Sequence, residues 1–348
     1  MKIISTLKQG FGQTSRTKRM ILFAWFVNVL FALVLALPLL NTLDNYLRGT
    51  VMEERLLQQM DPAWSRTFRY DFEKSELTQF VDYTIFGYAP FVNHLEMYLN
   101  GTFFKSIGSF LSNLIFHFEV TPGYNSILVL LGFLYICMSN FLAGGFIGIY
   151  SKEYRSSFSE FMMDGAKYFG SFFRLALLAL VFYYLFFTLL VDWIDAGIPA
   201  WTRNAASEQT PYVSYMIKGI VALFLLSVFT MIFDYARIRI VLDDRTSALL
   251  ASVAGGRFAL RNFFNTYGLY FLLALFGVVL IAIYALLESL IPQDSYWPLV
   301  AVLLLQQLYM IARFWLKGNF YASQTALYRD LAAEEHRGTL AATASPAS

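Results

Sequence analysis

Two histidine–glutamate pairs come closest to known metal chemistry in this sequence: His94-x-Glu96 and His117-x-Glu119. Two imidazoles and two carboxylates form a ligand set that can hold zinc. However, residues at i and i+2 do not share a helix face, and both pairs lie in stretches with helical patterning. We therefore expect no metal site, and these four residues are the candidates should one exist.

A denser group of charges follows a long apolar run, in the stretch FDYARIRIVLDDR from Phe233 to Arg245. If the apolar run crosses a membrane, Arg237, Arg239 and Arg245 mark its end and can extend their long stems to the headgroups. Asp234 lies nearly a turn deeper and has no long stem, so it needs a partner.

Two arginines are candidate partners for Asp234. Arg313 has a similar depth on the last apolar run, and Arg237 follows Asp234 by three residues on the same helix face. We expect a structural ion pair, and a proton or ion path is the alternative.

The residue inventory argues against an enzyme. The chain has three histidines and one cysteine, and no Ser-His-Asp set or pair of carboxylates within one site can be assembled. We expect no catalytic residue and no cofactor.

A net charge of only +2 also argues against nucleic-acid binding, which requires a concentrated basic surface.

The composition indicates a membrane protein. Of the 348 residues, 57% are hydrophobic and 14% are charged, against roughly 25% charged in soluble domains. Six apolar segments approach the ~20 residues that a spanning helix needs. They are 20–40, 126–150, 172–192, 215–237, 266–288 and 297–317. We predict an all-α, multi-pass protein, whose first segment is a retained anchor because it lacks a cleavage site.

Basic residues predict the orientation. With the N-terminus in the cytoplasm, 18 of the 26 Lys and Arg side chains fall on the inner side, as the positive-inside rule expects. Both termini are then cytoplasmic.

The remaining segments suggest how the chain is organised. Residues 1–19 form a cytoplasmic segment, and 41–125 form an extracytoplasmic helical segment that includes an amphipathic interfacial helix over 103–118. Residues 126–320 form a five-span membrane domain, and 321–348 form a cytoplasmic tail, partly disordered from Ala332 onward.

Within the five-span domain, two units of span, amphipathic elbow helix and span repeat in the same direction. The first elbow has an apolar stripe of Phe158, Phe161, Met162, Gly165, Phe169 and Phe172. The second has Leu249, Leu250, Val253, Leu260 and Phe264, with Asp243 or Asp244 as the expected cap.

The runs NFLAGGFIGIY, FSEFMMDGAKYFGSFFR and DYARIRIVLDDRTSALLASVAGGRFALRNFF resemble those of uncharacterised bacterial six-span membrane proteins. These include the membrane domain of some glycerophosphodiester phosphodiesterases. The resemblance covers roughly residues 126–320 and implies a bacterial inner-membrane protein. No phosphodiesterase catalytic domain is present, so the resemblance implies no catalytic role.

Other polar features within the spans have structural explanations. Asn28, Asn140, Gln306 and Gln307 are expected to hydrogen-bond between helices. The small-residue face Gly144, Gly145 and Gly148 is expected to pack against another helix. The loop TSALLASVAGGRFALRNFF stands where a permease contacts its ATPase, but it lacks the opening and closing residues of that motif.

Two functions remain open. The first is a non-enzymatic scaffold or partner-binding subunit of an inner-membrane complex, in contact with the lipid bilayer and other membrane proteins. The second is a transporter or permease component. A dry, packed bundle favours the scaffold, and a polar cavity that reaches the middle of the membrane favours the transporter.

Overall fold

The computed structural model describes residues 2–50, 64, 67–68, 70, 126–152, 154–204, 207, 209–292 and 295–344. These residues are helical with no strand among them, as predicted. The metal candidates His94, Glu96, His117 and Glu119, and the interfacial helix expected over 103–118, lie outside these residues.

Six of the described helical segments are long and apolar enough to cross a membrane, and each overlaps one predicted span. They are Lys18–Leu47, Leu130–Tyr150, Phe158–Thr202, Gln209–Leu242, Phe263–Ser289 and Tyr296–Glu335. Large apolar side chains such as Leu30, Val278 and Ile283 are about half exposed along them. An apolar surface of this kind suits contact with lipid rather than water.

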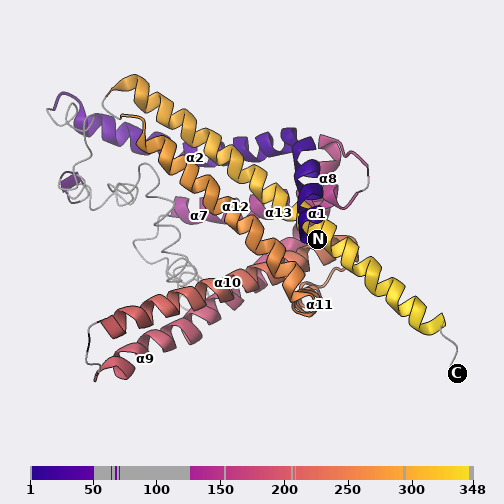
Figure 1. The fold of residues 1–348 in the computed structure, drawn as a ribbon. Helices are drawn as coiled ribbons and strands as arrows, with labels where there is room; N and C mark the ends of the chain where they lie inside the picture. The colour runs from indigo at the N-terminus through magenta and orange to yellow at the C-terminus, as the bar shows by residue number, and fades with distance from the viewer. Residues whose placement is uncertain are drawn as a thin grey trace.

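Figure 1 shows how the helices are arranged. Helix α2 (Lys18–Leu47), α12 (Phe263–Ser289) and α13 (Tyr296–Ala344) run together in one direction. Helix α10 (Gln209–Leu242) and the short α9 (Asp192–Thr202) diverge from them in another. Helix α7 (Ser126–Tyr150) lies between these groups, and all of them converge at the end where α1 (Lys2–Arg16) packs across α13.

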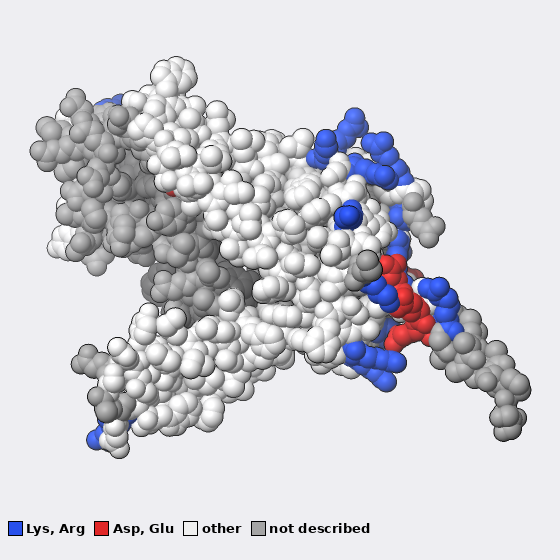
Figure 2. All heavy atoms as spheres, viewed as in Figure 1, with Lys and Arg blue, Asp and Glu red and all other residues white. Residues whose placement is uncertain are grey.

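Charges gather where the helices converge, which we call the charged end. Ion pairs there join Lys2 to Glu334, and Arg261 to Glu335. In Figure 2 most of the visible Lys and Arg side chains lie at this end, and the middle of the molecule carries almost none. The basic segments predicted for one side of the membrane therefore share one end of the molecule.

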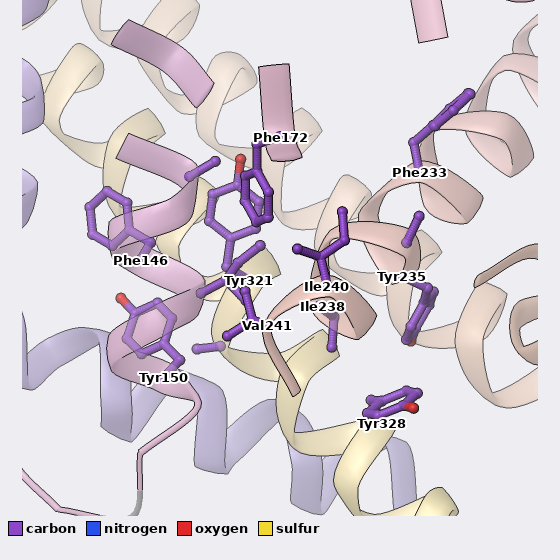
Figure 3. Packing of buried hydrophobic residues seen from close by; sticks show 14 of the residues in the cluster. Phe146, Tyr150, Phe172, Phe233, Tyr235, Ile238, Ile240, Val241, Tyr321 and Tyr328 are labelled. Atoms are coloured by element: carbon purple, nitrogen blue, oxygen red, sulfur yellow. The ribbon is translucent and has the colours of Figure 1, made fainter. Parts of the chain in front are cut away.

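The core also lies near the charged end, and Figure 3 shows part of its packing. Its fully buried members include Phe161, Phe172, Tyr235, Ile238 and Leu327, which come from α8 (Phe158–Leu185), α10 and α13. Since the helices diverge away from this end, packing between them is concentrated where they meet.

The first elbow is not a separate helix. Residues 158–172 continue without a break into the span, as α8, and a π-helical turn over Phe186–Val191 links α8 to α9. Ser157 and Glu160 form a reciprocal capping box at the start of α8. No proline interrupts the helix from there to the end of the predicted span, so it continues.

The second elbow is a separate helix, α11 (Ala248–Arg261), and differs from its prediction in two ways. Its cap is Ser247, whose hydroxyl accepts from the Leu250 amide, and not Asp243 or Asp244. Its predicted apolar stripe faces away from the protein, with Val253 71% exposed and Phe264 88% exposed. The face that packs on α10 holds the small residues Ala251, Gly255 and Ala259 together with Phe258, whose ring centre lies 5.3 Å from that of Tyr235.

The carboxyl-terminal segment also differs from its prediction. Instead of a tail from residue 321 that is disordered beyond Ala332, α13 continues as one helix to Ala344. Residues 321–328 are all buried, because α13 passes between α1 and α10 at the charged end. The polar residues of this stretch, Ser323, Gln324 and Thr325, face neighbouring helices and not solvent.

Candidate functional site

The charged stretch after Phe233 forms the buried inner part of α10. From Phe233 to Val241, every side chain except Arg237 and Arg239 is at most 9% exposed. Helices α7, α8, α11 and α13 all contact α10, so little of its circumference remains free. This segment is part of the core and not a simple boundary with solvent.

Asp234 pairs with Arg237 and not with Arg313. Arg237 Nη1 lies 3.1 Å from Asp234 Oδ1, and Gln324 Nε2 donates to Asp234 Oδ2 at 3.3 Å. Arg313 precedes Gln324 by eleven residues, a rise of about 16 Å along α13. Its guanidinium lies over the Tyr309 ring instead, 5.9 Å from the ring centre. The predicted depth of Arg313 was wrong because α13 extends further past the charged end than the apolar run indicated.

The neighbouring arginine, Arg239, is also not a headgroup contact. It donates to the Ala254 carbonyl of α11 at 2.9 Å and pairs with Asp243 at 2.8 Å. Asp243 in turn accepts from the Tyr328 hydroxyl of α13 at 2.9 Å. These contacts tie α10, α11 and α13 together, so Arg239 serves packing rather than a lipid contact.

A cavity of about 510 Å³ adjoins the Asp234–Arg237 pair. Its polar lining includes Asp234, Arg237 and Lys317, with Ser139, Asn140 and five further hydroxyl-bearing residues. These five are Tyr135, Tyr183, Thr230, Tyr270 and Tyr321. Two cations against one carboxylate give the lining a net positive charge.

The cavity extends well into the span region. Arg237 and Lys317 lie toward the charged end, whereas Ser139 precedes the end of α7 at Tyr150 by eleven residues, or about 16 Å. That distance is about half of the ~30 Å hydrocarbon thickness of a bilayer. A space with charged and hydroxyl groups in an otherwise mostly apolar lining therefore reaches the middle of the helix bundle.

Several buried polar atoms around this site have no hydrogen-bond partner among the described residues. They include Arg237 Nε and Gln324 Oε1, next to Asp234, and Thr325 Oγ1 on α13. Buried polar groups nearly always have partners, so unpaired ones indicate water or a ligand. The site therefore has capacity to bind more than its own side chains.

The glycine face of α7 has the structural role predicted for it. A Cβ at Gly145 would lie 2.8 Å from the Phe161 carbonyl oxygen, and one at Gly148 would lie 2.5 Å from the Asp164 Cβ. Because only glycine allows this approach, α7 and α8 pack closely near the charged end. The close pair forms one wall of the cavity, which includes Ala143 and Ala176.

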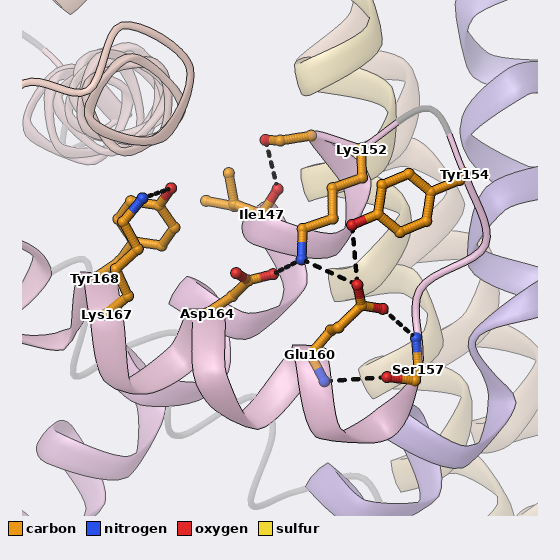
Figure 4. Close-up of polar contacts among 9 residues, drawn as sticks. Ile147, Lys152, Tyr154, Ser157, Glu160, Asp164, Lys167 and Tyr168 are labelled. Carbon is orange, nitrogen blue, oxygen red and sulfur yellow. Dashed lines mark hydrogen bonds and ion pairs between the residues drawn. The ribbon is translucent and has the colours of Figure 1, made fainter.

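A polar network fixes the loop between α7 and α8 (Figure 4). Lys152 Nζ lies 2.8 Å from Asp164 Oδ2, and the Tyr154 hydroxyl donates to Glu160 at 2.9 Å. Burial lowers the pKa of Lys152, but the hydrogen bond and attraction of Asp164 outweigh burial and raise that pKa above its usual value. The lysine is therefore charged at neutral pH, and its contribution to stability declines only as the pH rises through that raised pKa.

Sequence reasoning missed Lys317, Tyr321 and Gln324, since it ended the last span at 317 and placed the tail beyond. A signal was available: the stretch GNFYASQTALY contains no helix breaker except one glycine and has small or polar residues on every face. This composition suits a helix buried on all sides, because small residues let neighbours approach.

Of the in-span amides, Gln307 accepts from Trp25 Nε1 at 3.1 Å, as expected between helices. Asn140 donates within its own helix, to the Ile136 carbonyl.

Metal ligation finds no support in the part of the chain that the structure describes, where no three His, Cys, Asp or Glu residues come together. No family model, curated protein or solved structure matches the chain. The described residues define a class, an all-α protein in which six of the described helices are long and apolar enough to cross a membrane.

Proposed function

We propose that the protein is a transporter or permease component of a bacterial inner membrane. In this proposal the charged end and both termini face the cytoplasm, in keeping with the excess of Lys and Arg there. The resemblance to the membrane domain of some glycerophosphodiester phosphodiesterases agrees with that location and adds no enzymatic role.

One observation carries the proposal: a cavity with charged groups in its lining that reaches the middle of the spans. Its lining includes the Asp234–Arg237 pair, Lys317 and tyrosine hydroxyls. Ionisable residues inside a membrane are costly and typically line substrate or ion paths. The excess positive charge favours a small ligand with an anionic group. In a scaffold we would expect this space to be filled with apolar side chains.

Thiol accessibility in lipid nanodiscs tests the cavity. In a Cys137→Ala background, Ser139→Cys places a thiol in the cavity lining, and Val278→Cys places one on the exposed apolar belt. Only the thiolate reacts with a charged methanethiosulfonate reagent, and thiolates form in water and not in hydrocarbon. We expect Ser139→Cys to be labelled and Val278→Cys to remain unlabelled. If both thiols were equally protected from labelling, the bundle would be dry and the scaffold function would be favoured.

A partner-binding subunit is the second candidate, and two features favour it. Leu249, Leu250 and Val253 of α11 face away from the protein, and α13 projects past the bundle (Figure 1). Comparing proteins that co-purify in gentle detergent with the full chain and with a chain that ends at Leu331 tests it. Loss of a stoichiometric partner from the shorter chain alone would support this candidate.

A further inference from the structure

A second hollow, separate from the cavity, lies at the charged end between two chain segments. It is a groove of about 840 Å³ between the α1–α2 junction and the loop that leads into α8. Arg16, Lys18 and Arg19 line it from the junction, and Arg155, Ser156 and Ser157 from the loop. Basic side chains at this part of the surface are visible at the upper right of Figure 2.

The groove is strongly positive. Four cations line it, and no acidic side chain among the described residues does so. The cations come from two segments more than a hundred residues apart, so the fold brings them together. A site of this charge favours an anion, and arginine in particular matches the geometry of phosphate oxygens.

The groove also offers a neutral donor. Ser156 Oγ is buried and has no hydrogen-bond partner among the described residues. A buried hydroxyl without a hydrogen-bond partner destabilises the fold unless a ligand or a water molecule forms a hydrogen bond with it. Ser156 lines the same groove as the arginines, and its hydroxyl is a potential donor to an oxyanion bound there.

The surrounding structure holds both walls in place. The Thr17 hydroxyl at the α1–α2 junction lies 2.9 Å from the Tyr150 hydroxyl at the end of α7. The Phe23 ring of α2 packs edge-on against Phe158 at the start of α8, with ring centres 5.2 Å apart. The groove is therefore part of the rigid framework.

The position of the groove indicates that the phosphate belongs to a lipid. It lies where α2 and α8 begin and α7 ends, which is the headgroup level if these helices cross a membrane. From Lys18, an exposed apolar row of Leu22, Phe26 and Leu30 continues along one face of α2 toward the middle of the bundle. A phosphate in the groove would thus have its acyl chains against that row.

We propose that this groove binds the phosphate of an anionic phospholipid, with the acyl chains along α2. The proposal rests on the membrane placement and not on the cavity, so either can fail alone. Bound lipid would join α1, α2 and the α7–α8 loop, and so hold the charged end at the membrane surface.

Native mass spectrometry in neutral detergent tests it, with dioleoylphosphatidylglycerol and dioleoylphosphatidylcholine as probes. We expect the protein to retain phosphatidylglycerol preferentially. Arg19→Gln/Arg155→Gln, one change from each wall, should weaken retention about tenfold or more, as the loss of two charged contacts implies. Ser156→Ala should weaken retention less. Melting temperatures without lipid establish that the variants fold.

The matched control is Arg257→Gln/Arg261→Gln, which removes two exposed arginines from the same end but outside the groove. It should retain phosphatidylglycerol as the unmodified chain does. Equal losses in the two double variants would show general attraction to charge and overturn the proposal. Displacement of the lipid by excess inorganic phosphate would overturn it too, since the site would then recognise free phosphate.

Discussion

At the scale of single residues, Asp234 shows how a buried charge is stabilised. Its carboxylate is satisfied by Arg237 on its own helix and by Gln324 from α13, while Arg237 also faces the cavity. A buried pair of this kind contributes little net stability when intact, but loss of one member leaves the other charge buried and uncompensated.

A mutant cycle tests the pair. Asp234→Asn alone should lower stability by up to about 3–5 kcal/mol, less any relief from water in the cavity, because it leaves Arg237 uncompensated. Asp234→Asn/Arg237→Met should recover part of the loss. Thermal unfolding in detergent measures both.

Arg313→Met supplies the control for this cycle. Because Arg313 lies about 16 Å along α13 from the Gln324 contact, its effect should add to that of Asp234→Asn without coupling. Coupling of Asp234 to Arg313 that exceeds its coupling to Arg237 would contradict the pairing.

At the scale of elements, small residues decide which faces meet. Helix α11 packs on α10 through Gly255, where an added Cβ would lie 2.6 Å from the Ala236 backbone nitrogen. The two helices approach this closely only without a side chain there.

Two adjacent glycines give a sharp test of this contact. Gly255→Ala should push α11 away from α10 and cost about 1–3 kcal/mol. Gly256→Ala, whose Cβ would meet only Ile232 at 3.4 Å, should be neutral or slightly stabilising, since alanine favours a helix. Unfolding midpoints compare the two variants, and equal midpoints would contradict the packing.

At the scale of the whole molecule, the arrangement separates a charged end from an apolar belt. The loop between α9 and α10 lies far from the charged end, and the loop between α10 and α11 lies at it (Figure 1). If α10 spans a membrane, these loops face opposite compartments.

Thiol labelling in intact cells checks the proposed orientation, again with Cys137 replaced by alanine. Ser207→Cys, in the α9–α10 loop, should react with a membrane-impermeant reagent, and Ser247→Cys, before α11, should react only after the cells are opened. The excess of Lys and Arg at the charged end is the reason to place that end inside. Reversed labelling would contradict it.

The sequence alone determined the secondary-structure class and the six apolar helices, because hydropathy over ~20 residues is a local property. It also predicted the glycine face of α7, which follows from residue size. Partners across helices depend on rotation and depth, and the sequence states neither. Only the tertiary structure therefore chose Arg237 over Arg313, turned Leu249, Leu250 and Val253 of α11 outward and buried α13 beyond Lys317. The cavity and the basic groove belong to that second group, since each is formed by residues distant in the chain that packing brings together.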